Sequence, residues 1–250
     1  DTIAANEISA VITELSKYKK VSDVAVCVVS KSGGTTETLV NASVVLDALK
    51  AKFGATIYKQ TIFIGNKGTE VAKAGKKLGV HVIAMPEHIG GRYSVGTAVG
   101  LVPLAILKHD TDSFIEGFLT VHEEDIEEVV AEGAARLSLL LQKKYSHYNF
   151  FAFEKRLTTL GAWYRQLFAE SIGKSVDRAG KPFTKGFVPT ISTPVELHSV
   201  GQLYLSGFAG VYTDFVTFDD DEHDFKIPKQ GIGKQFSKFT AQEVTTAIYG

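Results

Sequence analysis

Residues 24–36, VAVCVVSKSGGTT, indicate the fold class of this chain. Val24 to Val29 is a short and mostly β-branched run, which is typical of a strand buried on both faces. The Gly- and hydroxyl-rich turn from Ser30 to Thr36 then opens a helix that runs through Leu39 to Leu49. A buried strand, a tight polar turn and a helix in this order predict the first half of a βαβ unit.

The same alternation recurs on both sides of this stretch. The patterns predict an amphipathic helix over residues 6–19, strands over 61–64 and 80–85, and helices over 70–78 and 94–107. Strands and helices that alternate at this spacing favour right-handed βαβ units on a parallel sheet. We therefore predict an α/β domain over residues 1–110.

The rhythm changes after residue 110. Thr120 and Glu123 have the spacing of a capping box and predict a helix start there, which residues 122–124 could shift by a residue or two. An amphipathic face follows over residues 126–141. Further patterns predict helices over 154–169 and 196–205 and strands over 187–188 and 211–218. Residues 111–250 are therefore expected to form a second α/β portion with a helical connection.

The composition is that of an ordinary globular protein. Of the 250 residues 44% are hydrophobic and 22% charged, and the formal net charge is −1. That balance gives no indication of a nucleic-acid partner or an acidic membrane surface. The longest apolar run, Ala98 to Leu107, is too short and too interrupted to span a bilayer. With Cys27 alone no internal disulfide can form, which favours a reducing compartment.

The loop Ser30-Lys31-Ser32-Gly33-Gly34-Thr35-Thr36-Glu37-Thr38 is the first candidate site. In α/β folds ligands bind where strands end at the carboxyl edge of the sheet. Free amides at a helix start favour an anion, and short hydroxyls beside glycines can donate to phosphate oxygens. It is not a P-loop, because the Gly-Lys-Ser/Thr spacing is missing. The alternative is a Ser/Thr-rich turn that only caps its helix.

Three further segments carry candidate groups. Gly90-Gly91-Arg92-Tyr93-Ser94 combines close backbone approach with a permanent positive charge, although it could be a tight turn with a solvated Arg. Glu170, expected at a helix end, could act as a base or be a solvated surface carboxylate. His198 could be a general acid/base near neutral pH, or merely packed or exposed.

Metal chemistry finds little support in the sequence. The seven His residues show no paired ligand spacing, and Cys27 has no Cys partner, so a zinc site is not expected. No Gly-x-Ser-x-Gly nucleophile elbow is present.

Taken together, these motifs resemble the phosphoglucose isomerase family, which is built on sugar-isomerase (SIS) domains. The likeness covers most of residues 20–218. Its matching segments are Val28 to Thr38, Gly90 to Val95, Gln166 through Lys174, and Leu197 to Gln202. The resemblance implies a three-layer α/β sandwich with a parallel sheet of the SIS type, whose second α/β portion is incomplete in this chain.

The resemblance also implies a role for each matching residue. Ser30, Lys31, Ser32 and Thr35 match the phosphate-binding loop. Arg92 matches the arginine that stabilises an anionic intermediate, and Glu170 the base that moves a proton between C1 and C2. His198 matches the histidine that assists ring opening, and Gln166 a glutamine that lines the site. No cofactor is implied.

The function so implied is reversible isomerisation of glucose 6-phosphate and fructose 6-phosphate through an enediolate. In this family the histidine comes from across a dimer interface, so the resemblance implies a homodimer. The implied reaction belongs to glycolysis and gluconeogenesis, so a cytoplasmic location is expected. The family also has a Gly-rich strand–turn earlier and a lysine on a later helix, neither of which this chain contains, so we expect an internal piece of a longer polypeptide. Two alternatives are a phosphoglucose/phosphomannose isomerase and a non-catalytic phosphosugar-binding regulator.

Overall fold

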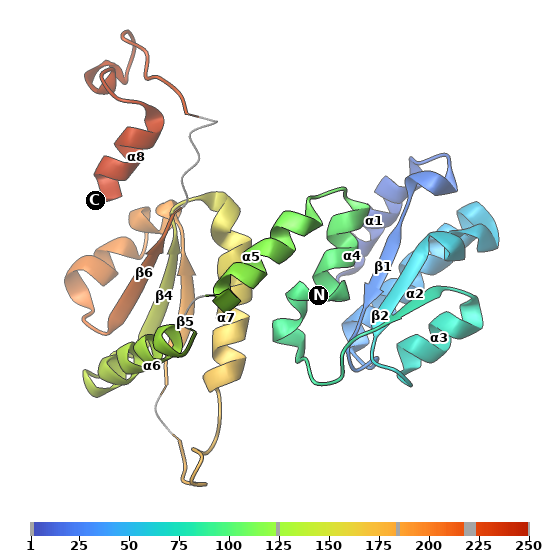
Figure 1. Cartoon of the computed structure of the whole chain (residues 1–250). Helices are drawn as coiled ribbons and strands as arrows, with labels where there is room; N and C mark the ends of the chain where they lie inside the picture. The colour runs from blue at the N-terminus through green and yellow to red at the C-terminus, as the bar shows by residue number, and fades with distance from the viewer. Residues whose placement is uncertain (1–2, 124–125, 184–185, 218–223, 250) are drawn as a thin grey trace. The chain divides into compact units, whose positions relative to one another are not determined.

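The computed structural model describes residues 3–123, 126–183, 186–217 and 224–249. The chain divides into two compact units, Asp1–Leu137 and Ser138–Gly250. The dividing point falls within helix α6 (Ile126–Gln142), downstream of residue 110. Each unit contains its own parallel sheet and helices (Figure 1).

The first unit is built on a three-stranded parallel sheet of order β1-β2-β3. Its strands are β1 (Val26–Val29), β2 (Thr61–Gly65) and β3 (His81–Ala84). Val28 lies beside Phe63, which lies beside Val82. The helices are α1 (Ala5–Ser16), α2 (Thr36–Phe53), α3 (Glu70–Leu78), α4 (Ala98–Ile106) and α5 (Thr111–Glu123). All three strands and the helix between each pair match the predicted βαβ units.

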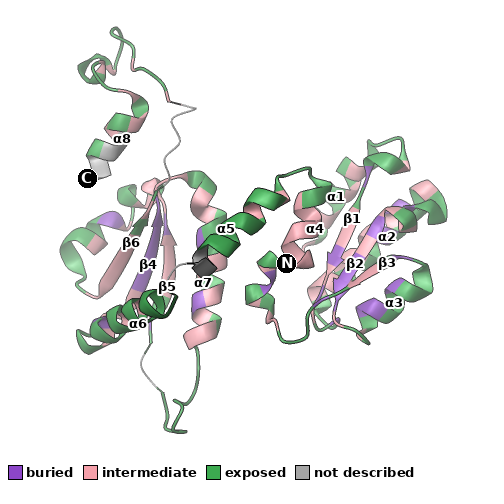
Figure 2. Ribbon diagram, viewed as in Figure 1, coloured by how far each residue is buried: buried purple, intermediate pink, exposed green. Residues whose placement is uncertain are grey.

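Helices α2 and α3 cover one face of this sheet. Val28 and Phe63 pack there against Leu46 of α2 and Val71 of α3, and all four are at most 7% exposed. The apolar spacing of α2 and α3 thus places their buried sides on one shared core, which the purple residues in Figure 2 trace. Figure 1 draws α4 on the other side of the strands, which gives the layered arrangement of an α/β sandwich.

Two helix boundaries differ from those expected in this unit. The helix predicted over 94–107 is a 3₁₀ helix, Gly91–Gly96, followed by α4 from Ala98. A Cβ at Gly100 would lie 2.1 Å from the Val95 carbonyl oxygen, so the 3₁₀ helix and the first turn of α4 approach each other there with no room for a larger residue. The predicted capping box is wrong, because Thr120 lies inside α5 and its hydroxyl donates to the Glu116 carbonyl.

The second unit has its own parallel sheet, of order β5-β4-β6. The strands are β4 (His147–Ala152), β5 (Val188–Ser192) and β6 (Val211–Val216). Helix α7 (Thr158–Ile172) packs on β4 and β5, and α8 (Ala241–Tyr249) comes near the end of the chain. Residue 218, at the end of the predicted strand 211–218, lies outside the described residues.

The core of this sheet is aromatic on the side of α7. Tyr148 of β4 is 2% exposed, and its ring centroid lies 5.0 Å from that of Phe168 and 6.2 Å from that of Tyr164. Near the other end of α7, a Cβ at Gly161 would lie 3.0 Å from the Phe150 ring. Helix α7 therefore starts near the carboxyl half of β4 and ends near the amino ends of the strands.

The helix predicted over 196–205 does not form. A 3₁₀ helix, Pro194–His198, and a π-helical turn, Leu203–Gly207, take its place. Pro194 cannot donate an amide, which suits the first turn of a short helix. The two parallel sheets with their helices confirm the predicted α/β class. Among the described residues, no helix has the length and apolar character needed to cross a membrane.

Candidate functional site

The loop between β1 and α2 presents its hydroxyls at the carboxyl edge of the first sheet. Ser30 is only 3% exposed, and its hydroxyl donates to Thr35 Oγ1 at 3.2 Å. The Gly34 amide donates to Ser32 Oγ at 3.3 Å. Thr35 is the N-cap residue of α2, yet its side chain makes no capping bond to that helix. The Thr35 hydroxyl therefore does not cap α2, as the alternative interpretation of the loop required. The first amides of α2 favour an anion.

Lys31 adds positive charge to this loop. The residue is half-buried, and its carbonyl accepts a 3.1 Å bond from the Asn66 amide after β2. That bond fixes the Lys31 backbone to the segment that follows the neighbouring strand.

The Gly90-Gly91-Arg92 turn follows β3 and therefore lies at the same edge of the same sheet. Ser94 is 5% exposed and its hydroxyl donates to the Gly91 carbonyl at 2.6 Å, which closes the turn. The Arg92 guanidinium lies 4.7 Å from the centroid of the Tyr93 ring, a cation–π contact that restrains its direction. Because β2 alone separates β1 from β3, the two loops begin about 10 Å apart.

In the second unit, Gln166 and Glu170 lie one turn apart on α7. The Gln166 side-chain amide donates to Glu170 Oε1 at 2.9 Å, and Lys174 Nζ donates to the Glu170 carbonyl, also at 2.9 Å. Glu170 lies in the last turn of the helix, which ends at Ile172, and there the dipole disfavours a carboxylate. The pairing supplies a donor that orients the carboxylate as a base would need.

His198 ends the 3₁₀ helix that follows β5, and its side chain is exposed. The helix is held by Glu196, whose carboxylate accepts from the Thr193 amide at 2.5 Å and from the Thr193 hydroxyl at 2.6 Å. Those two bonds hold the pKa of Glu196 below its usual value. The anion therefore fixes the turn that carries the imidazole.

The structure brings together only part of the predicted set within each unit. Ser30, Ser32, Thr35 and Arg92 share one sheet edge in the first unit. Within the second unit, Glu170 is in the last turn of α7, which ends near the amino ends of the strands, whereas His198 is in the 3₁₀ helix that follows the carboxyl end of β5. Glu170 and His198 of one chain therefore do not form a pair inside this unit.

One residue at this edge was not expected from the sequence. Asn66 follows the carboxyl end of β2, between the two loops of the first unit. Its side-chain Oδ1 is buried and has no hydrogen-bond partner among the described residues. The signal available in the sequence was its position, since an amide directly after a predicted strand lies at the ligand-binding edge.

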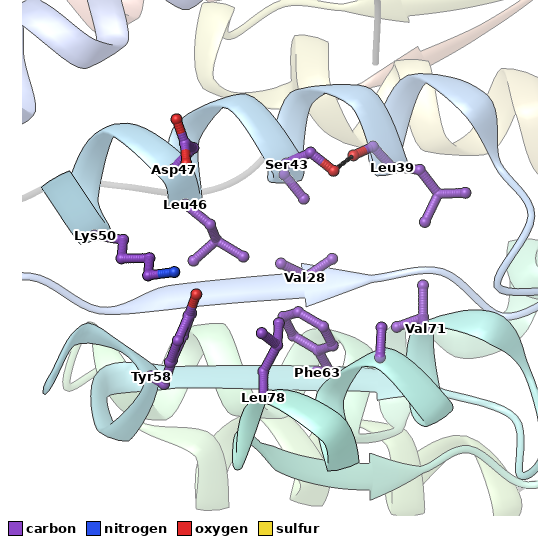
Figure 3. Close-up of a pocket in the computed structure, with 12 residues that line it drawn as sticks. Val28, Leu39, Ser43, Leu46, Asp47, Lys50, Tyr58, Phe63, Val71 and Leu78 are labelled. Atoms are coloured by element: carbon purple, nitrogen blue, oxygen red, sulfur yellow. Dashed lines mark hydrogen bonds between the residues drawn. The ribbon is translucent and has the colours of Figure 1, made fainter. Parts of the chain in front are cut away.

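A separate hollow lies between α2 and α3, on the helix-covered face of the sheet (Figure 3). Its volume is about 270 Å³, and Val28, Leu46 and Phe63 line it. Lys50 and Tyr58 lie at one end. None of residues 30–35 lines it, so the hollow is distinct from the hydroxyl loop.

Comparison with known proteins places the chain in a family. A model of that family, described as phosphoglucose isomerase, matches residues 2–244. The glucose-6-phosphate isomerases of Staphylococcus saprophyticus and Clostridium tetani are 32% and 30% identical to the chain, each over 231 residues and 89% of it. The chain spans about half the length of these relatives, 50% and 49%.

Solved structures show the same fold. The crystal structure of a hypothetical protein from Thermus thermophilus covers 99% of this chain and 60% of its own, with a TM-score of 0.86 and 27% identity. A glucose-6-phosphate isomerase from Chlamydia trachomatis covers 95% of this chain and 46% of its own, with a TM-score of 0.74 and 22% identity. By the match over residues 2–244, the chain belongs to the phosphoglucose isomerase family.

Proposed function

We propose that the protein interconverts glucose 6-phosphate and fructose 6-phosphate. The observation that carries the proposal is the hydroxyl loop Ser30–Thr35, which shares a sheet edge with Arg92 in a chain matched by the family over residues 2–244. The loop would bind the phosphate group, and Arg92 would face the sugar carbons. The protein would act in the cytoplasm, and its sugar-isomerase domain would occupy residues 1–110, which include all three strands of the first sheet.

The chemistry follows from the groups named. The Glu170 carboxylate takes the proton from C2 and returns it to C1. The enediolate formed between these steps is anionic, so a fixed guanidinium stabilises it more than the neutral sugar. Base assistance of this kind contributes about 10²–10⁴-fold. Ser30, Lys31, Ser32 and Thr35 would bind the phosphate group at the far end of the sugar. That binding orients the sugar so that the Glu170 carboxylate meets C2 and C1.

We further propose that the site is completed by a second copy of the protein. Glu170 and His198 lie toward opposite ends of the strands in the second unit. A histidine that opens the sugar ring beside Glu170 would then come from the partner of a homodimer. This arrangement makes activity depend on dimer concentration.

The proposal is tested with Glu170→Gln in the full-length natural protein. We expect turnover of glucose 6-phosphate to fall by at least about 10²-fold while binding of the sugar phosphate, measured by calorimetry, stays within threefold. Glu116→Gln, an exposed carboxylate on α5, is the matched control and should leave both unchanged. Full activity of Glu170→Gln would show that Glu170 is not the base. An assay of the parent protein with mannose 6-phosphate tests the alternative of a dual-specificity phosphoglucose/phosphomannose isomerase.

The trans role of His198 is tested by mixing two inactive variants. Neither Glu170→Gln nor His198→Ala alone should turn over cyclic glucose 6-phosphate at the parent rate. Mixed dimers contain one site with both native groups, so activity should return to as much as half that of the parent per mixed dimer. No recovery from a mixture proved to contain heterodimers would overturn the dimer proposal.

A further inference from the structure

The hydroxyl loop rests on the segment that follows the neighbouring strand. Ser30 donates its amide to the Ile64 carbonyl at 3.0 Å, and the Asn66 amide donates to the Lys31 carbonyl at 3.1 Å. A Cβ at Gly65 would lie 2.5 Å from the Ser30 carbonyl oxygen. The path of the loop is thus set by residues 64–66 as well as by its own bonds.

The loop also approaches Thr69 closely at Gly33. Gly33 has φ +68°, and a Cβ there would lie 2.5 Å from Thr69 Cβ and 2.9 Å from Thr69 Oγ1. Both the left-handed backbone and the contact distance exclude a side chain at residue 33. The loop therefore packs its backbone directly onto the Thr69 side chain.

The Thr69 side chain is in turn held by two hydrogen bonds. It is the N-cap of α3, where its hydroxyl accepts from the Ala72 amide at 3.4 Å and donates to the Asn66 carbonyl at 2.8 Å. Asn66 is also the residue whose amide holds Lys31. A continuous set of contacts therefore joins the start of α3 to the middle of the loop.

We infer that Thr69 is a positioning residue for the phosphosugar site. This inference rests on the proposed function of the loop. The hydroxyls of Ser30, Ser32 and Thr35 bond within the loop, so their spacing depends on the path that Gly33 follows over Thr69. Thr69 itself makes no contact with the sugar in this role. It acts by holding the loop in the shape that receives a phosphate group.

The role predicts an effect on binding with little effect on the chemical step. Thr69→Val in the full-length protein keeps the shape of the side chain and removes both hydroxyl bonds. We expect the KM for glucose 6-phosphate to rise about three- to tenfold with kcat within twofold, since a phosphate group that binds more weakly still orients the sugar once it is bound. The Kd of inorganic phosphate, measured by calorimetry, should rise by the same factor. Thr69→Ser retains the hydroxyl, so its KM and its Kd for inorganic phosphate should both lie within twofold of the parent values.

A matched control separates positioning from loss of a helix cap. Thr240 is the residue before α8, and its hydroxyl accepts from the Glu243 amide at 3.2 Å. Thr240→Val should lower stability without changing KM or the phosphate Kd. A Thr69→Val protein that is less stable but has the parent KM and phosphate Kd would overturn the inference, as would a loss confined to kcat.

A second variant approaches the same contact from the loop. Gly33→Ala introduces the clash with Thr69 and should weaken phosphate binding by at least the factor seen for Thr69→Val. If Thr69→Val does not fold, folded Gly33→Ala should still bind phosphate at least about threefold more weakly than the parent. If the parent binds phosphate but does not isomerise the sugar, the proposed function fails and the Thr69 inference stands on binding alone. If the parent binds no phosphate, the inference is overturned.

Discussion

The side-chain amide of Gln166 donates a hydrogen bond of 2.9 Å to the carboxylate of Glu170, one turn further along α7. Both side chains are exposed, and an i,i+4 pair of this kind on a helix surface contributes about 0.2–0.5 kcal/mol, which favours one rotamer of the carboxylate. Glu170 lies near the end of its helix, where the dipole does not favour the anion. The amide of Gln166 therefore offsets part of an unfavourable position and directs the carboxylate.

Removal of this donor should slow proton transfer. For Gln166→Met we expect kcat to fall about twofold, because the base loses the exposed hydrogen bond that favours its direction. Steady-state kinetics of the full-length protein measure the effect. Gln142→Met, at the exposed end of α6, is the control for a Gln-to-Met change on a helix. A rise in KM with an unchanged kcat would instead assign Gln166 to substrate binding alone.

The buried amide of Asn149 should be a main determinant of stability in the second unit. Asn149 is 0% exposed, and its Oδ1 accepts from the hydroxyls of Thr190 and Ser192, both at 2.9 Å. Asn149→Leu leaves these two donors on β5 without their acceptor. We expect the free energy of unfolding to fall by about 2 kcal/mol or more, as urea denaturation would measure.

A double variant tests whether the cost comes from those unpaired hydroxyls. Ser192 is 1% exposed, so Ser192→Ala removes one orphaned donor from a site that water does not reach. Asn149→Leu combined with Ser192→Ala should therefore be more stable than the sum of the two single changes predicts, by about 0.5–3 kcal/mol. Strict additivity would show that the network does not act as a unit.

This network also shows where the sequence could not be interpreted. The helix predicted over 70–78 has the bounds of α3, because Thr69 and Gly79 mark its ends with a cap and a left-handed residue. Strand β4 was not predicted, because its polar Asn149 interrupts an apolar run and its pairing partners lie some 40 and 65 residues away. Short-range patterns report local caps well and long-range pairing poorly.

The residues of the candidate site show the same difference between local patterns and long-range contacts. Residue types and strand ends indicated the hydroxyl loop and the Arg92 turn, since both follow parallel strands. No spacing could show that Thr35 leaves its helix uncapped, or that Thr69 lies against Gly33, because these depend on contacts across the sheet edge. The separation of Glu170 from His198 follows from the direction of α7 relative to the strands, which is set by long-range packing such as that of Phe168 on Tyr148 and of Gly161 on Phe150.

The turn that carries His198 should open only in acid. Hydrogen bonds from the Thr193 side chain and backbone lower the pKa of Glu196. A lowered pKa in the fold adds stability above the unfolded value of about 4.3, and that stability is lost as the pH falls through the folded pKa. We expect the Ser199 amide, which donates to the Glu196 carbonyl, to exchange slowly at neutral pH and faster below about pH 4.

Hydrogen exchange followed from about pH 3 to about pH 7 measures this opening. Correction for the intrinsic exchange rate leaves the contribution of the turn. Glu196→Gln should abolish the step, because its side chain does not ionise. A step that persists unchanged in Glu196→Gln would show that a group other than Glu196 controls the opening.

The fold should weaken in alkali because of Tyr148. Its hydroxyl donates to the Asp214 carboxylate, and its ring is enclosed by Phe168 and Tyr212 at 5.0 and 5.3 Å between centroids. Burial first, and then the bond to Asp214, raise the pKa of Tyr148 well above its usual value. The folded protein therefore keeps a proton that the unfolded chain releases near about pH 10.

Stability from a raised pKa is fully present below the unfolded value and is lost as the pH rises beyond it. One proton accounts for a fall of at most about 1.4 kcal/mol per pH unit above about pH 10. Urea unfolding at pH 9, 10 and 11 measures the fall. Tyr148→Phe should be less stable at pH 9 yet lose less between pH 9 and pH 11, since it has no phenol to ionise. Tyr18→Phe, on an exposed side chain, should retain the alkaline loss of the parent. An equal loss in the Tyr148→Phe protein would mean that another group releases the proton on unfolding.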